Sequence, residues 1–217
     1  ESWTRACEDE LGKHGYILNI SKQKDFYKNK VQFADNRVFV IVSDSLRYEV
    51  AAVLAKELRK ETQSEVALNS MQGIFPTITK FGMAALLPHK ELTAEIKSTT
   101  KTERLAVLAD GASTESNNRE NVLKKANVNS VALQYKVLAN LKRAERLDLV
   151  RGKNVIYIYH DKIDSASHGD ENSVFAACDE AIEEIKNMVR IIVNDFGGTR
   201  VYITADHGFL YTHRALN

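Results

Sequence analysis

Arg37-Val-Phe-Val-Ile-Val-Ser-Asp44 is the stretch of sequence that decides the fold. Its five consecutive apolar residues are rich in Val and Ile, are too few for a buried helix and lead into a polar loop, so they predict a strand buried on both faces. Residues 46–60 follow, with apolar side chains at helical spacing and Lys and Glu between them. A strand, a polar turn and a helix make half of a βαβ unit, which predicts an α/β protein.

The same alternation recurs along the chain. Further strands are predicted at 66–68, 105–108, 154–159 and 201–204, and further helices from about residue 79, over about 129–149 and over 172–195. This order predicts three layers, with a mainly parallel sheet and helices on both faces. Because no linker or internal repeat interrupts the pattern, we expect one α/β domain over 37–217, preceded by a helical segment, 1–36, that packs on its core.

Composition excludes several classes of protein. The 217 residues hold 30 Lys and Arg against 29 Asp and Glu, a net charge of +1, which disfavours a protein that coats nucleic acid. Two cysteines cannot form a disulfide scaffold, and no apolar run approaches the ~18 residues of a membrane span. We therefore expect a cytoplasmic protein without a membrane anchor. Because the chain begins with Glu1, we also expect it to be part of a longer protein.

Metal-ligand residue types follow three of the predicted strands. These residues are Asp44, then His160, Asp161, Asp164 and His168, then Asp206 and His207. The carboxyl ends of parallel strands share one edge of a sheet, and Asp and His are preferred ligands of Zn²⁺. In a helical turn, Asp164 and His168 would lie on one face and could hold one ion. A single Asp at a strand end could instead cap the next helix, and His160 and Asp161 could support the ligands rather than bind.

A threonine begins the helix predicted near residue 79. In Phe75-Pro-Thr-Ile-Thr79, the last hydroxyl precedes a run of good helix formers, so it could simply be an N-cap. A hydroxyl held beside a metal ion could also act as a nucleophile. Arg47 and Lys80 are near this position and could pair with phosphate oxygens, or could be solvated cations on helix faces.

Three segments together resemble a known family. They are Val40-Ile-Val-Ser-Asp-Ser-Leu-Arg-Tyr-Glu49, Phe75-Pro-Thr-Ile-Thr-Lys-Phe-Gly-Met-Ala-Ala-Leu-Leu-Pro88 and Thr204-Ala-Asp-His-Gly-Phe209. In this order, with an Asp-x-x-x-His between the last two, they resemble the PglZ domain. That domain is named from bacterial phage-growth-limitation (BREX) systems and belongs to the alkaline phosphatase superfamily, so the resemblance implies an alkaline phosphatase-like fold.

The resemblance implies a role for each matching residue. It implies two divalent metal ions, expected to be Zn²⁺, and Thr79 as the nucleophile, with Thr77 as a weaker candidate. The implied metal ligands are Asp44, Thr79, Asp164, His168, Asp206 and His207. A further histidine completes one ion in relatives, and His213 is the only histidine after His207. The Pro-Asn that follows the nucleophile in relatives is replaced here by Lys80-Phe-Gly82, so substrate contacts at that point do not transfer.

The function implied is that of a metal-dependent phosphatase or phosphodiesterase domain in a phage-resistance protein. Its expected partners are a phosphate-ester or nucleotide substrate and other phage-defence proteins, with direct nucleic-acid binding undecided. The alternative is a non-catalytic structural or regulatory component of a defence complex. A dinucleotide-binding domain is excluded because no Gly-x-Gly-x-x-Gly follows the first strand.

Overall fold

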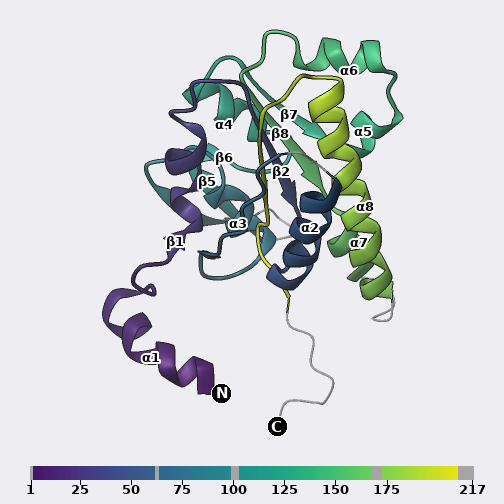
Figure 1. Ribbon diagram of the computed structural model, residues 1–217. Helices are drawn as coiled ribbons and strands as arrows, with labels where there is room; N and C mark the ends of the chain where they lie inside the picture. The colour runs from purple at the N-terminus through teal and green to yellow at the C-terminus, as the bar shows by residue number, and fades with distance from the viewer. Residues whose placement is uncertain (1, 62–63, 99–102, 168–172, 210–217) are drawn as a thin grey trace.

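Four parallel strands form the largest sheet of the computed structural model, which describes residues 2–61, 64–98, 103–167 and 173–209. In order across the sheet they are β7 (Ser130–Gln134), β8 (Val155–His160), β2 (Val38–Ser43) and β9 (Arg200–Thr204) (Figure 1). In β2, Ser43 pairs with His160 and Val42 pairs with Thr204. The three strands therefore end level with one another, and the segments that follow them meet at one edge.

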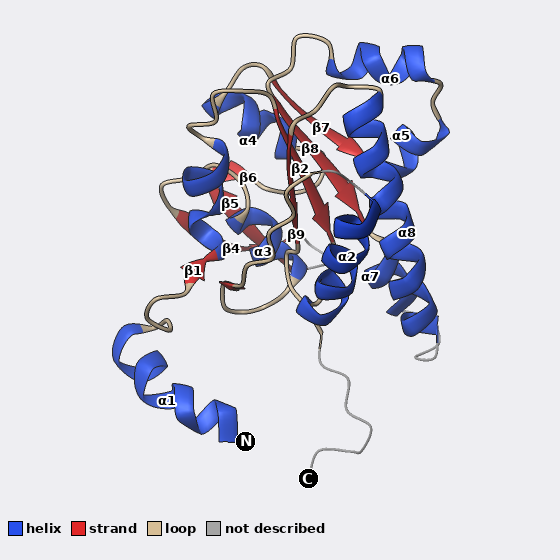
Figure 2. Cartoon of the chain, viewed as in Figure 1, coloured by secondary structure: helices blue, strands red, loops and turns tan. Residues whose placement is uncertain are grey.

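Helices cover both faces of this sheet, which confirms the predicted three-layer α/β architecture (Figure 2). One face carries α2 (Tyr48–Glu61), α5 (Tyr135–Asn140), α6 (Arg143–Val150) and α8 (Ser173–Asn194), and α7 (Lys162–Ser167) contacts α8. The other face carries η2 (Tyr27–Val31), α3 (Thr79–Ala85) and α4 (Arg119–Ala126), and η1 (Gln23–Asp25) contacts α3. None of the helices in the described ranges is long and apolar enough to cross a membrane.

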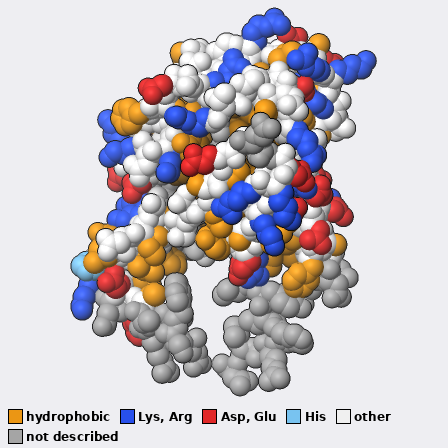
Figure 3. All heavy atoms as spheres, in the orientation of Figure 1, with side chains coloured by type: hydrophobic (Ala, Val, Ile, Leu, Met, Phe, Trp, Pro, Cys, Tyr) orange, Lys and Arg blue, Asp and Glu red, His pale blue; other side chains and the backbone are white. Residues whose placement is uncertain are grey.

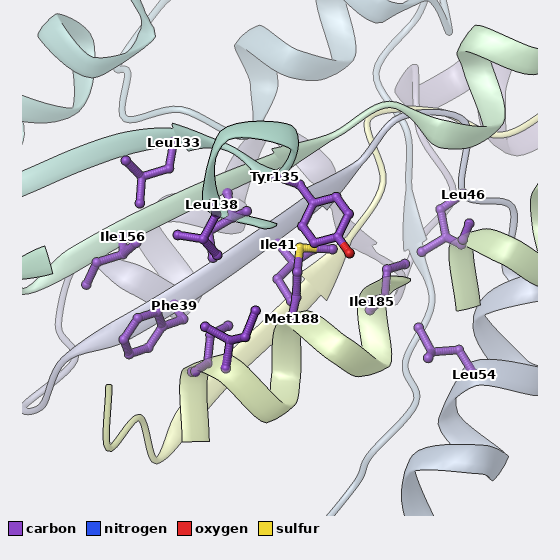
Figure 4. Close-up of a cluster of buried hydrophobic side chains, with 14 of the residues drawn as sticks. Phe39, Ile41, Leu46, Leu54, Leu133, Tyr135, Leu138, Ile156, Ile185 and Met188 are labelled. Atoms are coloured by element: carbon purple, nitrogen blue, oxygen red, sulfur yellow. The ribbon is translucent and has the colours of Figure 1, made fainter. Parts of the chain in front are cut away.

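Side-chain alternation along β2 builds two hydrophobic cores. Phe39 and Ile41 belong to the core under α8, together with Ile185 and Met188, and Figure 4 shows Ile41 beside Met188. Val38, Val40 and Val42 point the other way, into the core under α3 and α4. A strand with apolar residues on both faces is what a central parallel strand requires, so the prediction from the stretch 37–44 is confirmed.

The prediction of a strand at 105–108 is correct, but that strand lies outside the parallel sheet. It belongs to β5 (Glu103–Ala109), which pairs antiparallel with β4 (Leu92–Ser98) and β6 (Ala112–Ser113). The strand predicted at 66–68 is wrong, since those residues are irregular. A two-residue strand, β3 (Met71–Gln72), follows instead and pairs with β1 (Ser21–Lys22).

The single helix predicted over about 129–149 is also wrong. Its first part is strand β7, and helices α5 and α6 make up the rest. Ala132, Leu133 and Gln134 favour a helix locally, but pairing with β8 and burial of Val131 outweigh that preference. A short strand of helix-forming residues therefore carries no local signal that separates it from the helices after it.

The N-terminal segment has two parts. Helix α1 (Ser2–His14) lies to one side of the sheet and its covering helices in Figure 1. Residues 23–31 instead contribute Phe26, Tyr27 and Val31 to the core under α3. The division of the chain at residue 36 stays a prediction.

Candidate metal centre

Three side chains from two strand ends meet at the edge of the parallel sheet. Asp44 follows β2, and Asp206 and His207 follow β9. One ligand atom from each of these residues lies within 4.8 Å of the other two. We call Asp44, Asp206 and His207 the strand-end cluster. It joins segments that are far apart in sequence, because β2 and β9 are neighbours in the sheet.

Both carboxylates of the cluster are buried, and one of their oxygens has no hydrogen-bond donor in the part of the chain that the structure describes. Asp44 is 7% exposed and Asp206 is 2% exposed. Oδ1 of Asp206 accepts a hydrogen bond from the Ser45 backbone N–H at 3.2 Å, whereas Oδ2 is buried and meets no hydrogen-bond donor among the described residues. Buried carboxylates normally have hydrogen bonds or a cation. An unpaired buried oxygen beside a second carboxylate therefore fits a cation-binding site.

His207 presents its other ring nitrogen to the cluster. Its Nδ1 lies 3.0 Å from the Gly208 carbonyl oxygen, which can only accept, so Nδ1 carries the proton and donates. In the neutral ring, Nε2 then holds a lone pair, and it lies 3.5 Å from Asp44 Oδ1 and 3.4 Å from Asp206 Oδ2. Two carboxylate oxygens and one imidazole nitrogen form a donor set that suits Zn²⁺.

The Thr79 hydroxyl lies beside this donor set. Its Oγ1 is 3.0 Å from His207 Nε2 and, with that ring neutral, donates to it. The residue before Thr79, Ile78, occupies the N-cap position of α3, so Thr79 is not the cap of this helix. Thr77 is exposed, and its methyl group faces Gly73. Between the two threonines considered from the sequence, Thr79 is therefore the one next to the cluster.

Ser45 links the cluster to Asp164, a role that sequence reasoning missed. Its backbone N–H donates to Asp206, and its Oγ lies 3.1 Å from Asp164 Oδ1 and 3.5 Å from Asp44 Oδ1. A φ of 62° places Ser45 in the left-handed region, which is rare outside glycine and common at functional turns. Asp164 thus lies one serine away from the strand-end cluster rather than within it.

Other residues singled out in the sequence have different surroundings. His160 is buried, with Nδ1 2.9 Å from Ser43 Oγ and Nε2 2.8 Å from Glu184 Oε2, so both ring nitrogens are occupied. Asp161 pairs with Lys136 at 3.0 Å. Both therefore support the edge of the sheet rather than the cluster. The proposed ligands His168 and His213 lie outside the described residues.

The two cations near the site are each paired with an acid. Arg47 donates to Glu49 through Nε and Nη2, at 2.9 and 2.7 Å. Lys80 donates to Glu115 at 2.8 Å. Neither cation forms a hydrogen bond or an ion pair with the strand-end cluster within the described ranges, and each has further N–H donors beyond those that its glutamate accepts.

Close packing between α3 and the segment that follows β9 places Thr79 next to the cluster. A Cβ on Gly82 would lie 2.2 Å from the Asp206 carbonyl oxygen, so only glycine permits this approach. The buried Gln23 side chain holds the same segment: its Nε2 donates to the Ala205 and Asp206 carbonyls at 2.9 and 2.6 Å. Its Oε1 accepts from Ile74 N–H at 3.1 Å, in the loop that leads to Thr79.

A Gly82→Ala variant should therefore be destabilised. Alanine gains about 1 kcal/mol in helix propensity, but the clash is with backbone and overpacking costs about 1–3 kcal/mol or more. We expect the clash to prevail, with a net loss of about 1–2 kcal/mol in the free energy of unfolding, measured in urea. Gly12→Ala is the matched control in α1, where nothing lies within 4 Å of the added Cβ. Equal stability of the Gly82 variant and the wild type would contradict the packing described.

Burial and like charge disfavour ionisation of the cluster in the metal-free protein. Burial first, and then the charges of Asp206 and Asp164, raise the pKa of Asp44 to about 7. Burial also raises the pKa of Asp206, against the lowering effect of His207. Two neighbouring carboxylates with raised pKa values are typical of sites that need a cation or a shared proton at neutral pH.

Metal-free protein should consequently lose stability as the pH rises from about 5 to 8. The pKa of Asp44 is about 7 when folded and about 3.9 when unfolded, so the folded state binds more protons in this window and stability falls with pH. We expect a loss on the order of 1–3 kcal/mol, read from urea unfolding in a chelator. Asp44→Asn should flatten the profile. If the free energy of unfolding of the wild type rises with pH in this window, or if Asp44→Asn shows the same pH dependence as the wild type, the raised pKa of Asp44 is ruled out as the cause of that dependence.

The chain is similar to proteins of a known family. The sequence profile described as the BREX system PglZ alkaline phosphatase-like domain matches residues 26–217. The chain is 38% identical over 225 residues to alkaline phosphatase-like protein BrxZ of Escherichia coli O9:H4 (strain HS). It is 36% identical over 221 residues to alkaline phosphatase-like protein PglZ of Bacillus cereus (strain H3081.97). The alignments cover 100% and 99% of the chain but 25% of each relative, so the chain spans about a quarter of their length.

Proposed function

Because the chain belongs to the BREX PglZ family of alkaline phosphatase-like domains, we propose that it is the phosphoester-hydrolysing domain of a bacterial phage-defence protein. The observation that carries the proposal is the 3.0 Å contact between Thr79 Oγ1 and Nε2 of His207, a member of the strand-end cluster. A hydroxyl held beside a set of metal ligands is the arrangement that a metal-assisted nucleophile requires.

In this proposal, three residues bind one metal ion, two bind another, and Ser45 orients the ligands. Asp44, Asp206 and His207 would hold a divalent metal ion, for which we propose Zn²⁺, and Asp164 would serve a second one together with His168. When bound, such ions make a neighbouring hydroxyl more acidic and offset the negative charge of a phosphoryl group. Ser45 orients Asp206 and Asp164 by its backbone N–H and its hydroxyl.

Thr79 supplies the nucleophile in this proposal. Its Oγ1 forms a bond to phosphorus as the bond from phosphorus to the leaving oxygen breaks, and the leaving group departs with a proton. The threonine hydroxyl releases its own proton to solvent during the attack, and the leaving oxygen takes one proton up from solvent, so the step balances. Water then cleaves the phosphothreonine, which yields phosphate or a phosphomonoester and restores Thr79. Placement by Gly82 and Gln23 fixes the hydroxyl beside the cluster before substrate arrives.

Surface charge supports a compact substrate. Lys and Arg side chains are interspersed with Asp and Glu on the face drawn in Figure 3, in keeping with a net charge of +1. A long nucleic acid is usually bound by an extended basic surface. We therefore propose a phosphate ester or a nucleotide as the substrate, and other phage-defence proteins as partners of the longer protein.

Hydrolysis of model substrates tests this function. Chelator-treated protein should gain activity toward p-nitrophenyl phosphate or bis(p-nitrophenyl) phosphate when zinc is added, and Asp44→Asn should lose it. Asp148→Asn is a matched control, because this carboxylate is 64% exposed and pairs only with Arg151 among the described residues. Failure of zinc, manganese and magnesium to support any hydrolysis would favour the alternative, a structural or regulatory component of a defence complex.

A further inference from the structure

A small cavity adjoins Thr79 on the side of the neighbouring antiparallel sheet. It has a volume of about 260 Å³ and is lined by Thr79, Lys80, Val107, Thr114, Glu115 and Arg119. We call it the Thr79 pocket. Its walls come from α3, from strand β5, from the segment after β6 and from the first residue of α4. None of these residues belongs to the strand-end cluster, so Thr79 is the one residue shared by the pocket and the contact with His207.

The pocket holds a guanidinium group in a fixed position. Nε of Arg119 donates to the Thr114 carbonyl oxygen at 3.2 Å, and Cζ lies 4.6 Å from the centroid of the Tyr159 ring. Thr114 is itself fixed, since it is buried and its hydroxyl donates to the Val107 carbonyl at 2.7 Å. A guanidinium that lies over a ring and is held through Nε has terminal nitrogens that can pair with an oxyanion.

The net charge of the pocket is positive. Glu115 is the only acid in its lining, and its charge is balanced by Lys80 at 2.8 Å. Arg119 remains as the unbalanced charge. The carboxylates of the strand-end cluster lie beyond Thr79, on the side of His207, so the two sides of this threonine differ in charge. Without a metal ion in the cluster, an anionic group is therefore favoured on the pocket side.

From this arrangement we propose that the Thr79 pocket binds a second oxyanion of the substrate, separate from the phosphoryl group that Thr79 attacks, and that Arg119 is its main contact. The inference rests on the proposed function and narrows the substrate class. Favoured substrates are phosphoesters that carry a further phosphate or carboxylate near the reacting phosphorus. A guanidinium fork pairs with either group through two parallel hydrogen bonds.

Matched nucleotide esters test the proposal. The probes are p-nitrophenyl thymidine 5′-phosphate and its 3′-phosphate and 3′-succinate derivatives, which differ only in the second anion. We expect the zinc-loaded protein to show kcat/KM on the order of tenfold higher for the anionic derivatives, with the difference in KM. Arg119→Gln should reduce this ratio to about one, whereas Arg200→Gln, an exposed charge-matched control at the start of β9, should keep it. A preference for only one derivative would identify phosphate or carboxylate as the group bound.

Affinity measurements test anion binding in the Thr79 pocket separately from the proposed phosphoester hydrolysis. In calorimetry without metal, thymidine 5′-monophosphate should bind more tightly than thymidine, which carries no anion, and Arg119→Gln should remove the difference. If no ester is hydrolysed but this difference in affinity is found, the proposed hydrolytic function is wrong and the proposal of an anion-binding Thr79 pocket is supported. Equal affinities of thymidine 5′-monophosphate and thymidine, or an unchanged difference in the Arg119 variant, would overturn the pocket proposal whether or not hydrolysis occurs.

Discussion

Thr79→Ala should reduce metal-dependent phosphoester hydrolysis by on the order of 10⁴-fold or more, because removal of a nucleophile leaves only the catalysis that comes from binding and electrostatics. Metal binding should persist, since Asp44, Asp206 and His207 keep their ligand atoms. Thr79→Ser should retain measurable turnover, because it keeps a hydroxyl at the same position. The measurement is kcat for bis(p-nitrophenyl) phosphate at saturating zinc.

Thr77→Ala is the matched control for this experiment. Thr77 is two residues earlier in the same loop, is exposed and lies near Gly73 instead of His207. We expect its kcat to stay within a fewfold of wild type. A large loss in the Thr77 variant with little change in the Thr79 variant would reverse the assignment of the nucleophile, and wild-type turnover in both would remove threonine from the mechanism.

Asp206→Asn should have opposite effects on stability with and without metal. In the metal-free protein, the substitution removes a negative charge that helps to raise the pKa of Asp44. The amide oxygen of the new side chain can still accept from Ser45 N–H in place of Oδ1. We therefore expect the metal-free variant to be more stable than wild type at pH 7.5, by on the order of 1 kcal/mol.

Zinc should reverse that order. Binding to the folded state stabilises wild type according to the ratio of zinc concentration to Kd, about 2.7 kcal/mol at one hundred times Kd. The variant lacks one charged ligand and should gain little. Thermal unfolding with and without zinc gives both quantities. A variant that is less stable than wild type without metal, and equally stabilised by zinc, would show that Asp206 serves packing and not metal binding.

The site was predictable from sequence as far as strands could be recognised. The apolar runs before Asp44 and Asp206 have strong local signals, and parallel strands bring their ends to a common edge. No local sequence pattern predicts the contacts that Gln23 and Gly82 make. A buried glutamine 182 residues from Ala205, and a glycine against the Asp206 carbonyl, become meaningful only once η1 and α3 are seen beside β9.

Parts of the fold could not be predicted from the sequence for a related reason. Strand β7 is built from residues that also suit a helix, so its pairing with β8 decides its conformation. Strand β5 has the apolar run of a parallel strand, yet it pairs with β4 in a separate sheet. Local patterns predict that an element exists; its partners depend on contacts between distant residues. Ser45 illustrates the same limit, because a serine after a strand-end aspartate gives no local sign of bonding to Asp164 and Asp206.

Calorimetric titration of chelator-stripped protein with zinc tests the central claim most directly, namely that the strand-end cluster is a metal centre. We predict saturable binding of one or two ions per chain in wild type. Asp206→Asn should weaken the tightest phase by at least the roughly 10- to 100-fold seen when even a supporting group of a metal site is lost. The Asp148→Asn control should bind as wild type does. Absence of saturable binding in wild type, or identical binding in the Asp206 variant, would contradict the account.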